Sequence, residues 1–501
     1  MFKIQDKMKI IKKIFSSVML LLICNIAFGN TDTRDSIIIE GVFIDSTLAE
    51  DGLFEVTVMQ PNAKMAWPSY SDVYRVNASK GKFRLTIPAE SNLFYASLAK
   101  GKGNTRDKLL YYSGLEAVFL FLPGDHITLK INKDNTLRFA GKGSEKMLCQ
   151  QKIYQAGAIT EAFQSRIIEL NNAKDFQELY DCILPFYINS WQAKLDILNS
   201  YKSLDTIVRK RILADCYGLT FHQFYKDFAL LINRDKRPFA LDFWNNKLVL
   251  LPNYPSNSES PLSYYLPQML YNRSLAAVRF TNNHAKDIPY NELYNLIKDN
   301  YSGALRDQIS LVSLFEYSNR IKILDDAQKV LNEMEFNQSQ KMLQEWIGKS
   351  KTGNPAFNFA LKDVKGNLVK LSDFKGKVLI LDFWYYGCFG CRFMPEALKP
   401  VVTAFKGNKS VVFLSVNVDP VQSRWENGLK SGDYTLKEQI DISTAPMGFY
   451  HPFLKHYNYK AFPQILVIDK DGNNVASNPP DPRGVKGGEK LIAMIKEVLG
   501  N

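Results

Sequence analysis

The pattern of hydrophobic and polar residues changes character twice along this chain of 501 residues. Between about residues 36 and 141, short apolar runs alternate with polar turns such as Pro123-Gly124-Asp125. Three of these runs lie at residues 53–59, 83–88 and 127–131. Short apolar runs separated by turn residues predict an antiparallel β-sandwich.

A helical spacing of apolar residues replaces this pattern from about residue 144 to residue 351. One predicted helix face carries Phe176, Leu179, Ile183 and Phe186. Apolar positions three and four residues apart lie on the same side of a helix. The middle of the chain is therefore predicted to be all-α.

The last part of the chain carries a candidate for chemistry, Cys388 and Cys391. Four apolar residues at 378–381 predict a buried strand before the pair, and a helix is predicted after it. A zinc site would need a second Cys or His pair, and a haem attachment site would need histidine where Arg392 stands. A redox pair fits best, because the N-terminus of a helix favours the thiolate of the first cysteine. We expect no metal and no other cofactor.

The residues around this pair resemble TlpA/ResA-type thioredoxin-like proteins. The matching residues are Pro355, Phe359, Leu361, Asp363, Gly366, Leu371, Gly376, Lys377, Phe383, Trp384, Cys388 and Cys391. Residues 411–419 are similar to the next core strand of that family, and residues 462–472 are similar to its cis-proline strand and hairpin. The resemblance covers about the last 150 residues and implies an α/β thioredoxin-like fold there.

The resemblance implies a role for three residues in catalysis. Cys388 would be the nucleophile and Cys391 would resolve the mixed disulfide. Asp382 matches the buried acid of thioredoxin, so we expect burial to raise its pKa and allow it to relay a proton to or from Cys391. Ser415 stands where thioredoxin has a lysine partner for this acid. The alternative for the two cysteines is a purely structural disulfide, and the alternative for Asp382 is an acid at a frayed strand end.

The same resemblance implies a substrate-binding surface made by Trp384, Phe462 and Pro463. In the family, the residue before the cis-proline pairs its backbone with the substrate chain, whereas an ordinary trans proline at a sheet edge is the alternative. The chain also departs from the family: Gly387 replaces the tryptophan before the first cysteine of thioredoxin, and Met394 replaces a frequent glutamate. These departures affect the redox potential more than the type of reaction.

The β region also has a resemblance, to the uncharacterised β domain found in front of thioredoxin-like modules of secreted bacterial proteins. The similar part is Pro123-Gly124-Asp125, the strand after it, and residues 141–146. Neither the residues nor the resemblance supplies a chemistry for this domain.

The N-terminus is predicted to be a signal peptide. Lysines precede an apolar run at residues 14–26, and small residues end at Gly29, where cleavage would leave Asn30 first. A retained anchor and lipidation at Cys24 are the alternatives. The formal charge of +12 would fall by four on cleavage, because residues 1–29 hold five lysines and one aspartate. The basic residues are scattered, so no nucleic-acid partner is expected.

The cysteines outside the CxxC pair and the signal segment are Cys149, Cys182 and Cys216. Their odd number and irregular spacing argue against a disulfide framework, and we expect buried small hydrophobic residues. An extracytoplasmic address, in the periplasm, would put the CxxC pair in an oxidising compartment, where it needs an external electron donor or acceptor protein.

The predicted organisation has four parts: a signal peptide at 1–29, a β-sandwich at 30–143, a helical domain at 144–350 and a thioredoxin-like domain at 351–501. The predicted function is extracytoplasmic thiol–disulfide exchange, as a reductase or isomerase, with protein thiols and disulfides as clients. One alternative is a peroxiredoxin-like peroxidase, although Leu381 and Tyr385 stand where that family has proline and Thr/Ser. Another is an envelope protein that binds a partner and carries a vestigial redox domain. Attachment to the membrane through the N-terminus stays open.

Overall fold

The computed structural model describes most of the chain after residue 35. The described residues are 36–48, 52–59, 71–88, 94–102, 107–108, 111–112, 115–156, 161–231, 237–248, 251, 263–281, 288–317, 323–459 and 461–500. The predicted signal segment and Cys24 lie outside these residues. The described residues form two compact units. The first consists of those up to Val58 and from Val73 to Tyr154, and the second consists mainly of those from Gln155 onward.

The first unit contains two packed β-sheets. One sheet has the order β11 (Leu137–Lys142), β10 (His126–Ile131), β1 (Ser36–Phe43) and β4 (Lys82–Pro88). The other has the order β3 (Ser71–Asn77), β2 (Gly52–Met59), β5 (Phe94–Lys102) and β6 (Asp107–Lys108), with β9 (Phe119–Phe121) also paired to β5. The rings of Phe54 and Phe83 stack between the sheets with centroids 4.2 Å apart. The predicted β-sandwich is therefore present.

One strand pair of this sandwich differs from the predicted antiparallel pattern. Strands β1 and β10 run parallel, with Ile39 opposite Ile127. A parallel pair needs a long crossover connection rather than a hairpin. The chain between Phe43 and His126 supplies it, and local sequence patterns carry no information about pairing over that distance.

Helix α2 (Ser144–Gln155) packs on the β-sandwich. The Gln150 side chain accepts a hydrogen bond from the Leu120 N–H at 2.9 Å, and the Tyr154 hydroxyl donates to the Val118 carbonyl at 2.5 Å. Lys146 forms a buried ion pair with Asp125 at 2.7 Å, in the predicted Pro-Gly-Asp turn. This turn therefore has a structural partner in the helix that follows the sandwich.

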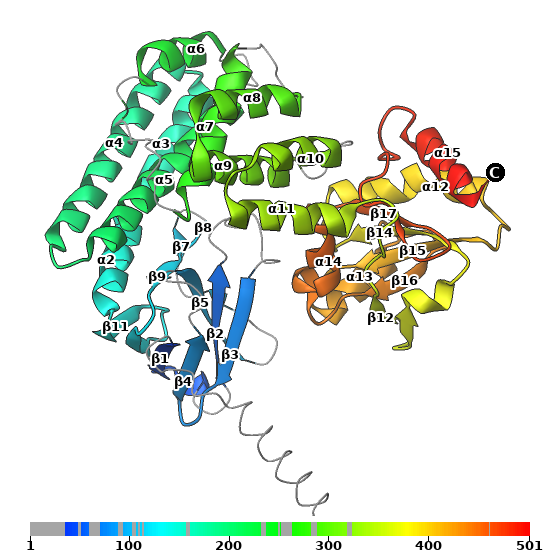
Figure 1. Cartoon of the computed structure of the whole chain (residues 1–501), viewed down its shortest axis with the longest axis horizontal. Helices are drawn as coiled ribbons and strands as arrows, with labels where there is room; N and C mark the ends of the chain where they lie inside the picture. The colour runs from blue at the N-terminus through cyan, green and yellow to red at the C-terminus, as the bar shows by residue number, and fades with distance from the viewer. Residues whose placement is uncertain are drawn as a thin grey trace, which may run out of the picture. The chain divides into compact units, whose positions relative to one another are not determined.

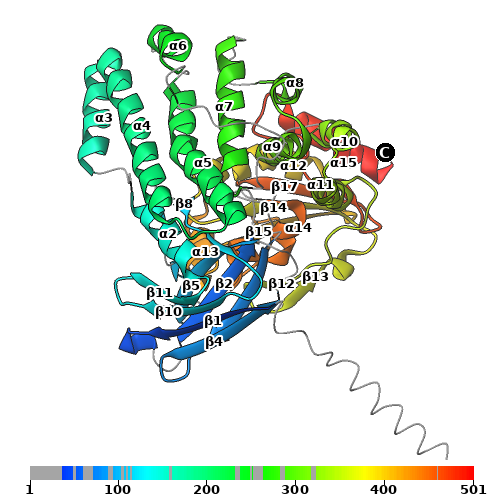
Figure 2. The same cartoon turned by 60° about the vertical axis from the view of Figure 1, so that its left-hand side comes forward.

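The helical region of the second unit consists of helices packed side by side, as the green ribbons of Figure 2 show. The helices are α3 (Glu161–Ala173), α4 (Phe176–Ser200), α5 (Thr206–Leu231), α6 (Arg237–Asn246), α7 (Leu266–Thr281), α8 (Tyr290–Asn300), α9 (Gly303–Glu316), α10 (Ile323–Glu333) and α11 (Asn337–Ser350). Cys149 and Cys216 are buried and Cys182 is half-buried, and none of the three forms a disulfide. The prediction that these cysteines are buried small residues outside a disulfide framework is confirmed for the first two.

A seven-stranded mixed sheet forms the C-terminal domain, drawn from yellow to red in Figure 1. Its order is β13 (Leu368–Lys370), β12 (Ala360–Asp363), β16 (Ile440–Ser443), β15 (Val411–Asn417), β14 (Val378–Trp384), β17 (Gln464–Ile468) and β18 (Asn474–Ala476). Strands β14, β15 and β16 are parallel, and β17 runs antiparallel beside β14. Four helices accompany the sheet: α12 (Met394–Ala404), α13 (Gln422–Ser431), α14 (Pro452–Tyr457) and α15 (Gly487–Leu499).

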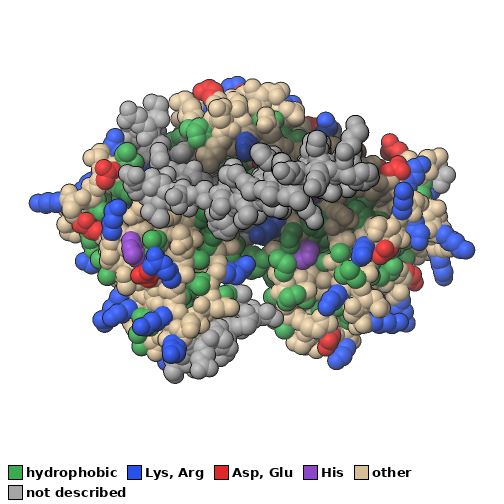
Figure 3. Space-filling model, turned by 60° about the horizontal axis from the view of Figure 1, so that its bottom comes forward, with side chains coloured by type: hydrophobic (Ala, Val, Ile, Leu, Met, Phe, Trp, Pro, Cys, Tyr) green, Lys and Arg blue, Asp and Glu red, His purple; other side chains and the backbone are tan. Residues whose placement is uncertain are grey.

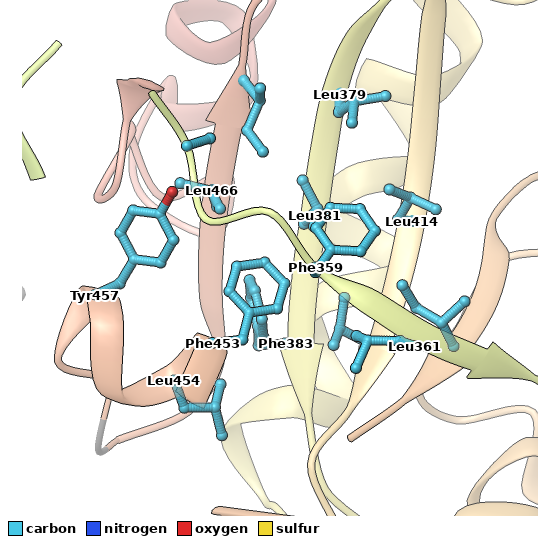
Figure 4. Packing of buried hydrophobic residues seen from close by; sticks show 14 of the residues in the cluster. Phe359, Leu361, Leu379, Leu381, Phe383, Leu414, Phe453, Leu454, Tyr457 and Leu466 are labelled. Carbon is cyan, nitrogen blue, oxygen red and sulfur yellow. The ribbon is translucent and has the colours of Figure 1, made fainter. Parts of the chain in front are cut away.

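The alternation of side chains along β14 creates a core on each face of this sheet. Leu379, Leu381 and Phe383 point to one face, where they meet Phe453 of α14 (Figure 4). Val378 and Ile380 point to the other face, where they meet apolar residues of α12 and α15. All seven residues of β14 are buried. Burial on both faces explains why this strand is a continuous apolar run in the sequence.

The surface carries scattered charge. On the face shown in Figure 3, lysine and arginine side chains are spread out and mixed with acidic side chains. Among the described residues, no helix is both long enough and apolar enough to cross a membrane.

Candidate active site

The predicted cysteine pair lies where β14 passes into a helix. Cys388 and Cys391 form a disulfide, and a short 3-10 turn, Gly390–Phe393, leads into α12. Gly387, just before the pair, has a φ of +93°, which a residue with a side chain rarely adopts. Glycine therefore replaces the family tryptophan at a position where this backbone needs it.

Both cysteines are nearly covered, with Cys388 3% and Cys391 0% exposed. The Cys391 backbone N–H donates to the Cys388 sulfur at 3.1 Å. The Phe462 carbonyl oxygen lies 3.7 Å from the same sulfur. In the reduced protein, an N–H donor aimed at Cys388 would stabilise its thiolate. The geometry thus favours Cys388 as the reactive thiol.

The segment before β17 packs against the CxxC turn. The Phe462–Pro463 peptide bond is cis, as predicted. A Cβ on Gly390 would lie 3.3 Å from Cδ of Pro463 and 3.7 Å from the carbonyl oxygen of Phe462. The small residue between the cysteines lets the two segments approach closely. The structure brings Phe462 and Pro463 to the disulfide, and their role in binding a client stays a prediction.

Asp382 is buried on β14 and 1% exposed. Among the described residues, neither carboxylate oxygen has a hydrogen-bond partner. Burial raises the pKa of this carboxyl to about 8, the Arg483 charge acts to lower it, and the Asp481 charge acts to raise it. The predicted rise in the pKa of Asp382 is confirmed, and Ser415 lies opposite Asp382 on β15 as the alignment indicates.

Trp384 lies behind the disulfide, not on the surface. Its side chain is 0% exposed and packs in one cluster with Cys388, Cys391, Trp425 and Tyr434. The indole N–H donates to the Ser415 hydroxyl at 2.7 Å. The sequence places Trp384 among the substrate-binding residues, but in this structure it has no exposed surface to offer a substrate. It supports the CxxC turn from within.

Tyr434 is a site residue that the sequence does not reveal. Its ring stacks on Trp384 with centroids 4.8 Å apart. Its hydroxyl oxygen accepts hydrogen bonds from the Gly387 N–H at 3.0 Å and from Nε of Arg392 at 3.1 Å. Tyr434 therefore holds the residue before Cys388 and the residue after Cys391. It lies more than 40 residues away in a segment with no motif, so no local spacing could identify it.

The backbone just before the CxxC pair has a second anchor, Asp419. This carboxylate is 1% exposed and accepts hydrogen bonds from the Tyr386 N–H at 2.7 Å and from Nε of Arg424 at 2.7 Å. The Arg424 guanidinium also donates to the Tyr386 carbonyl oxygen. The backbone before the cysteines is thus held at Tyr386, through both its N–H and its carbonyl group.

Aromatic side chains also lie at the surface beside the pair. Phe389, between the cysteines, is 76% exposed and makes an edge contact with Phe393, whose exposure is 54%. The ring of Phe462 lies 6.0 Å from Tyr385 and 5.8 Å from Phe449. Exposed apolar rings thus lie on the surface next to the CxxC turn.

The position of the family glutamate is part of the core in this chain. Met394 is 2% exposed and packs with Ile380 and Leu398. An ionised glutamate would be costly among these apolar neighbours. The buried acid of this domain is therefore sought on β14, at Asp382, and not at position 394.

Comparison with known proteins supports the assignment of this domain. The AhpC/TSA family model matches residues 352–475. Two curated relatives are named thiol-disulfide oxidoreductase ResA. The protein from Bacillus thuringiensis subsp. konkukian is 26% identical over 150 residues, which are 30% of this chain and 80% of that protein. The protein from Bacillus cereus is 28% identical over 127 residues, which are 25% of this chain and 69% of that protein.

A solved structure also resembles the domain. A putative thiol-disulfide oxidoreductase from Bacteroides vulgatus has 30% sequence identity, with 29% of this chain and 98% of that chain covered and a TM-score of 0.26.

The C-terminal domain is a thioredoxin-like domain of the TlpA/ResA type. By this domain and its CxxC pair, the chain is an enzyme of the thiol–disulfide oxidoreductase class.

Proposed function

We propose that this chain is an extracytoplasmic thiol–disulfide oxidoreductase that exchanges its Cys388–Cys391 pair with cysteines of client proteins, as a reductase or isomerase. The observation that carries the proposal is the disulfide at the strand-to-helix junction, with an N–H aimed at the Cys388 sulfur. The Phe462 carbonyl oxygen lies beside the same sulfur. A client chain paired with this segment would have its own disulfide next to Cys388.

Reduction of a client begins with the dithiol form of the pair. The Cys388 thiolate attacks one sulfur of the client disulfide, the client bond breaks, and the other client sulfur leaves as a thiolate. Cys391 then loses its proton and attacks the Cys388 sulfur, which releases the second client thiolate and forms the Cys388–Cys391 disulfide. Two electrons pass to the client. A partner protein with a dithiol must return them in the next cycle.

Asp382 supports the second of these steps. A carboxyl with a pKa raised to about 8 by burial exchanges protons near neutral pH. In reduction, its carboxylate would accept the proton of the Cys391 thiol. In the reverse reaction, its protonated form would return it. The buried acid thus matches the proton balance of the exchange.

Trapping of clients tests the proposal in the full-length chain. Cys391→Ser leaves no resolving thiol, so mixed disulfides with client proteins should accumulate on Cys388 and appear on non-reducing gels. Cys182→Ser is the matched control, because it removes a half-buried cysteine of the helical region. Absence of adducts from Cys391→Ser under conditions in which the parent reduces insulin would exclude protein clients of this kind.

Alkylation of the reduced chain tests the assignment of roles. Near neutral pH, Cys388 should be labelled before Cys391, with the peptides separated by mass spectrometry. Preferential labelling of Cys391 would reverse the two roles. Consumption of hydrogen peroxide without a client would favour the peroxidase alternative instead.

The proposed location rests on the N-terminal segment. Sequencing of the N-terminus of the purified mature protein should give Asn30 as the first residue. A lipid-modified N-terminal Cys24 or a retained apolar segment would show a membrane-attached form.

A further inference from the structure

The segment between β18 and α15 brings a charged pair to the CxxC turn. Nη1 of Arg483 donates a hydrogen bond to the carbonyl oxygen of Gly390 at 3.1 Å. Gly390 lies between the two cysteines. This contact joins residues that are 93 positions apart, so no local spacing in the sequence could connect Arg483 with the CxxC turn.

Arg483 also lies next to the cis-proline. A Cβ built on Gly390 would be 3.3 Å from Nη1 of Arg483 and 3.3 Å from Cδ of Pro463. The guanidinium therefore sits where the CxxC turn and the segment before β17 meet. Its side chain is 31% exposed, so a client at this junction would approach a positive charge.

Asp481 holds the guanidinium in this place. Nη2 of Arg483 lies 2.5 Å from Oδ2 of Asp481, and Nε lies 2.9 Å from Oδ1. The Arg483 N–H also donates to Oδ1 at 3.0 Å, and the Gly484 N–H donates to the Asp481 carbonyl oxygen at 3.0 Å. The pair thus rests on a tight turn, and both charges stay near the disulfide.

The surroundings of Asp382 contain few other charges. On the neighbouring strands it faces Ser415 and Ile465, which are uncharged. The helices on its side of the sheet, α12 and α15, present apolar residues to the core, and their charged residues Glu396, Lys399, Glu489, Lys490, Lys496 and Glu497 lie outside it. Asp441 is one strand further, beyond Ser415. The disulfide itself carries no charge.

We propose that Arg483 and Asp481 are positioning residues with opposite effects on the redox centre: Arg483 favours the anionic forms of Asp382 and Cys388, and Asp481 disfavours these forms. The inference deepens the proposed function. A positive charge near a carboxylate or thiolate stabilises the anion, and a negative charge destabilises it. In agreement, the Arg483 charge acts to lower the pKa of Asp382 and the Asp481 charge acts to raise it.

The signs give a sharp test, because both residues belong to one ion pair. Arg483→Gln and Asp481→Asn break the same ion pair. A purely structural role would therefore shift the titration midpoints of Asp382 and Cys388 in the same direction in both variants. The electrostatic role moves them in opposite directions. Lys399→Gln removes a positive charge from the exposed side of α12 and is the matched control.

The measurement is a titration of Asp382 in the oxidised full-length chain. The infrared band of the protonated carboxyl is assigned by its loss in Asp382→Asn, and its midpoint is followed with pH. Arg483→Gln should raise the midpoint and Asp481→Asn should lower it, each by about half a unit, and the shifts should shrink in high salt. Arg483→Lys should stay nearer the parent, because it keeps the charge. Lys399→Gln should match the parent.

The same variants test Cys388 in the reduced chain. The pH midpoint of Cys388 alkylation, read from its peptide by mass spectrometry, should rise in Arg483→Gln and fall in Asp481→Asn. Shifts in the same direction in the two variants, or no shift of either group, would overturn the inference.

Failure of this inference is distinguishable from failure of the proposed function. Neither titration uses a client protein or an electron donor. A chain that traps no client could still show opposite shifts in the two variants. A chain that traps clients but shows no opposite shifts would keep its proposed function and lose this role for the pair.

Discussion

At the scale of single residues, the buried acid makes the strongest link between chemistry and stability. Asp382 has no hydrogen-bond partner among the described residues, and burial raises its pKa from 3.8 to about 8. The folded chain therefore binds this proton more tightly than the unfolded chain. The contribution of the protonated carboxyl to the free energy of unfolding is fully present below pH 4 and is lost as the pH rises through about 8.

Asp382→Asn should therefore gain stability relative to the parent as the pH rises. The gain should be smallest near pH 4 and reach on the order of a few kcal/mol near pH 8. In that range the unfolded parent has released the proton of this carboxyl, so the folded parent must either bind the proton again or bury a charged group. Denaturant midpoints of both proteins across this range, with the disulfide intact, give the difference. A difference that is independent of pH would place Asp382 in contact with water. The variant should also exchange disulfides more slowly where the proton of Cys391 limits the rate.

Tyr434→Phe should slow exchange without unfolding the domain. The change keeps the ring on Trp384 but removes the hydroxyl that accepts from Gly387 and Arg392. A hydrogen bond contributes about 1 kcal/mol to stability, so two lost bonds should loosen the CxxC turn and slow the reaction of Cys388 several-fold.

Tyr457→Phe is the matched control for this change. The Tyr457 hydroxyl also has two partners, because it accepts from the Phe357 N–H at 3.0 Å and donates to Asn474 at 2.5 Å. It belongs to the core on the other face of the sheet. Denaturant midpoints should show similar losses of stability in the two variants. Alkylation rates should show a slower reaction of Cys388 in Tyr434→Phe alone. Equal rates in the two variants would remove Tyr434 from the reaction.

The chemistry-bearing residues are more predictable than the residues that hold them. Cys388, Cys391 and Asp382 lie within ten residues, so spacing and an apolar strand suffice to identify them. Tyr434 and Arg483 reach the site from distant segments through side-chain contacts. A pattern of hydrophobic residues records burial but not which distant hydroxyl or guanidinium meets a given turn.

At the scale of elements, α13 is positioned by a glycine. A Cβ on Gly428 would lie 2.5 Å from the ring of Trp384, closer than side chains can approach. The ring is already held by Tyr434 and Ser415. The helix can therefore lie against the tryptophan only while this position has no side chain.

Gly428→Ala should destabilise the C-terminal domain by about 1–3 kcal/mol, because the new methyl group forces α13 away from Trp384. Gly488→Ala is a control with the opposite sign. Its Cβ would be 3.8 Å from Val401, an ordinary contact, and alanine favours a helix over glycine by up to about 1 kcal/mol. Urea denaturation measures both. A neutral Gly428→Ala would mean that the Trp384 environment is easily repacked.

The sequence predicts most of these elements but not how they pair. The apolar runs of β14, β15 and β17 are each visible because burial on both faces demands them. The parallel pairing of β1 with β10 and the place of α2 on the β-sandwich are not visible. Both depend on contacts between residues that are far apart in the chain.

At the scale of the whole molecule, the two compact units suggest separable unfolding. Each unit has its own buried residues, and the disulfide belongs to the second. Units with separate cores unfold as separate cooperative steps. The order of β, helical and α/β regions is visible in the sequence, because each has its own hydrophobic period. The exact limits of the domains stay a proposal.

Calorimetry of the full-length chain should therefore show more than one transition. Reduction of the disulfide should shift only a transition that belongs to the second unit, because Cys388 and Cys391 lie in that unit. Cys388→Ser should make the trace insensitive to reductant. A single transition that shifts as a whole would show that the units unfold together.

The burial of Trp384 and Trp425 against the disulfide has an optical consequence. A disulfide accepts an electron from an excited indole and so quenches its fluorescence. The oxidised chain should emit weakly from these two of its six tryptophans, and reduction should brighten them. The enzyme would then report its own turnover without a label, and Trp384→Phe should remove much of the signal.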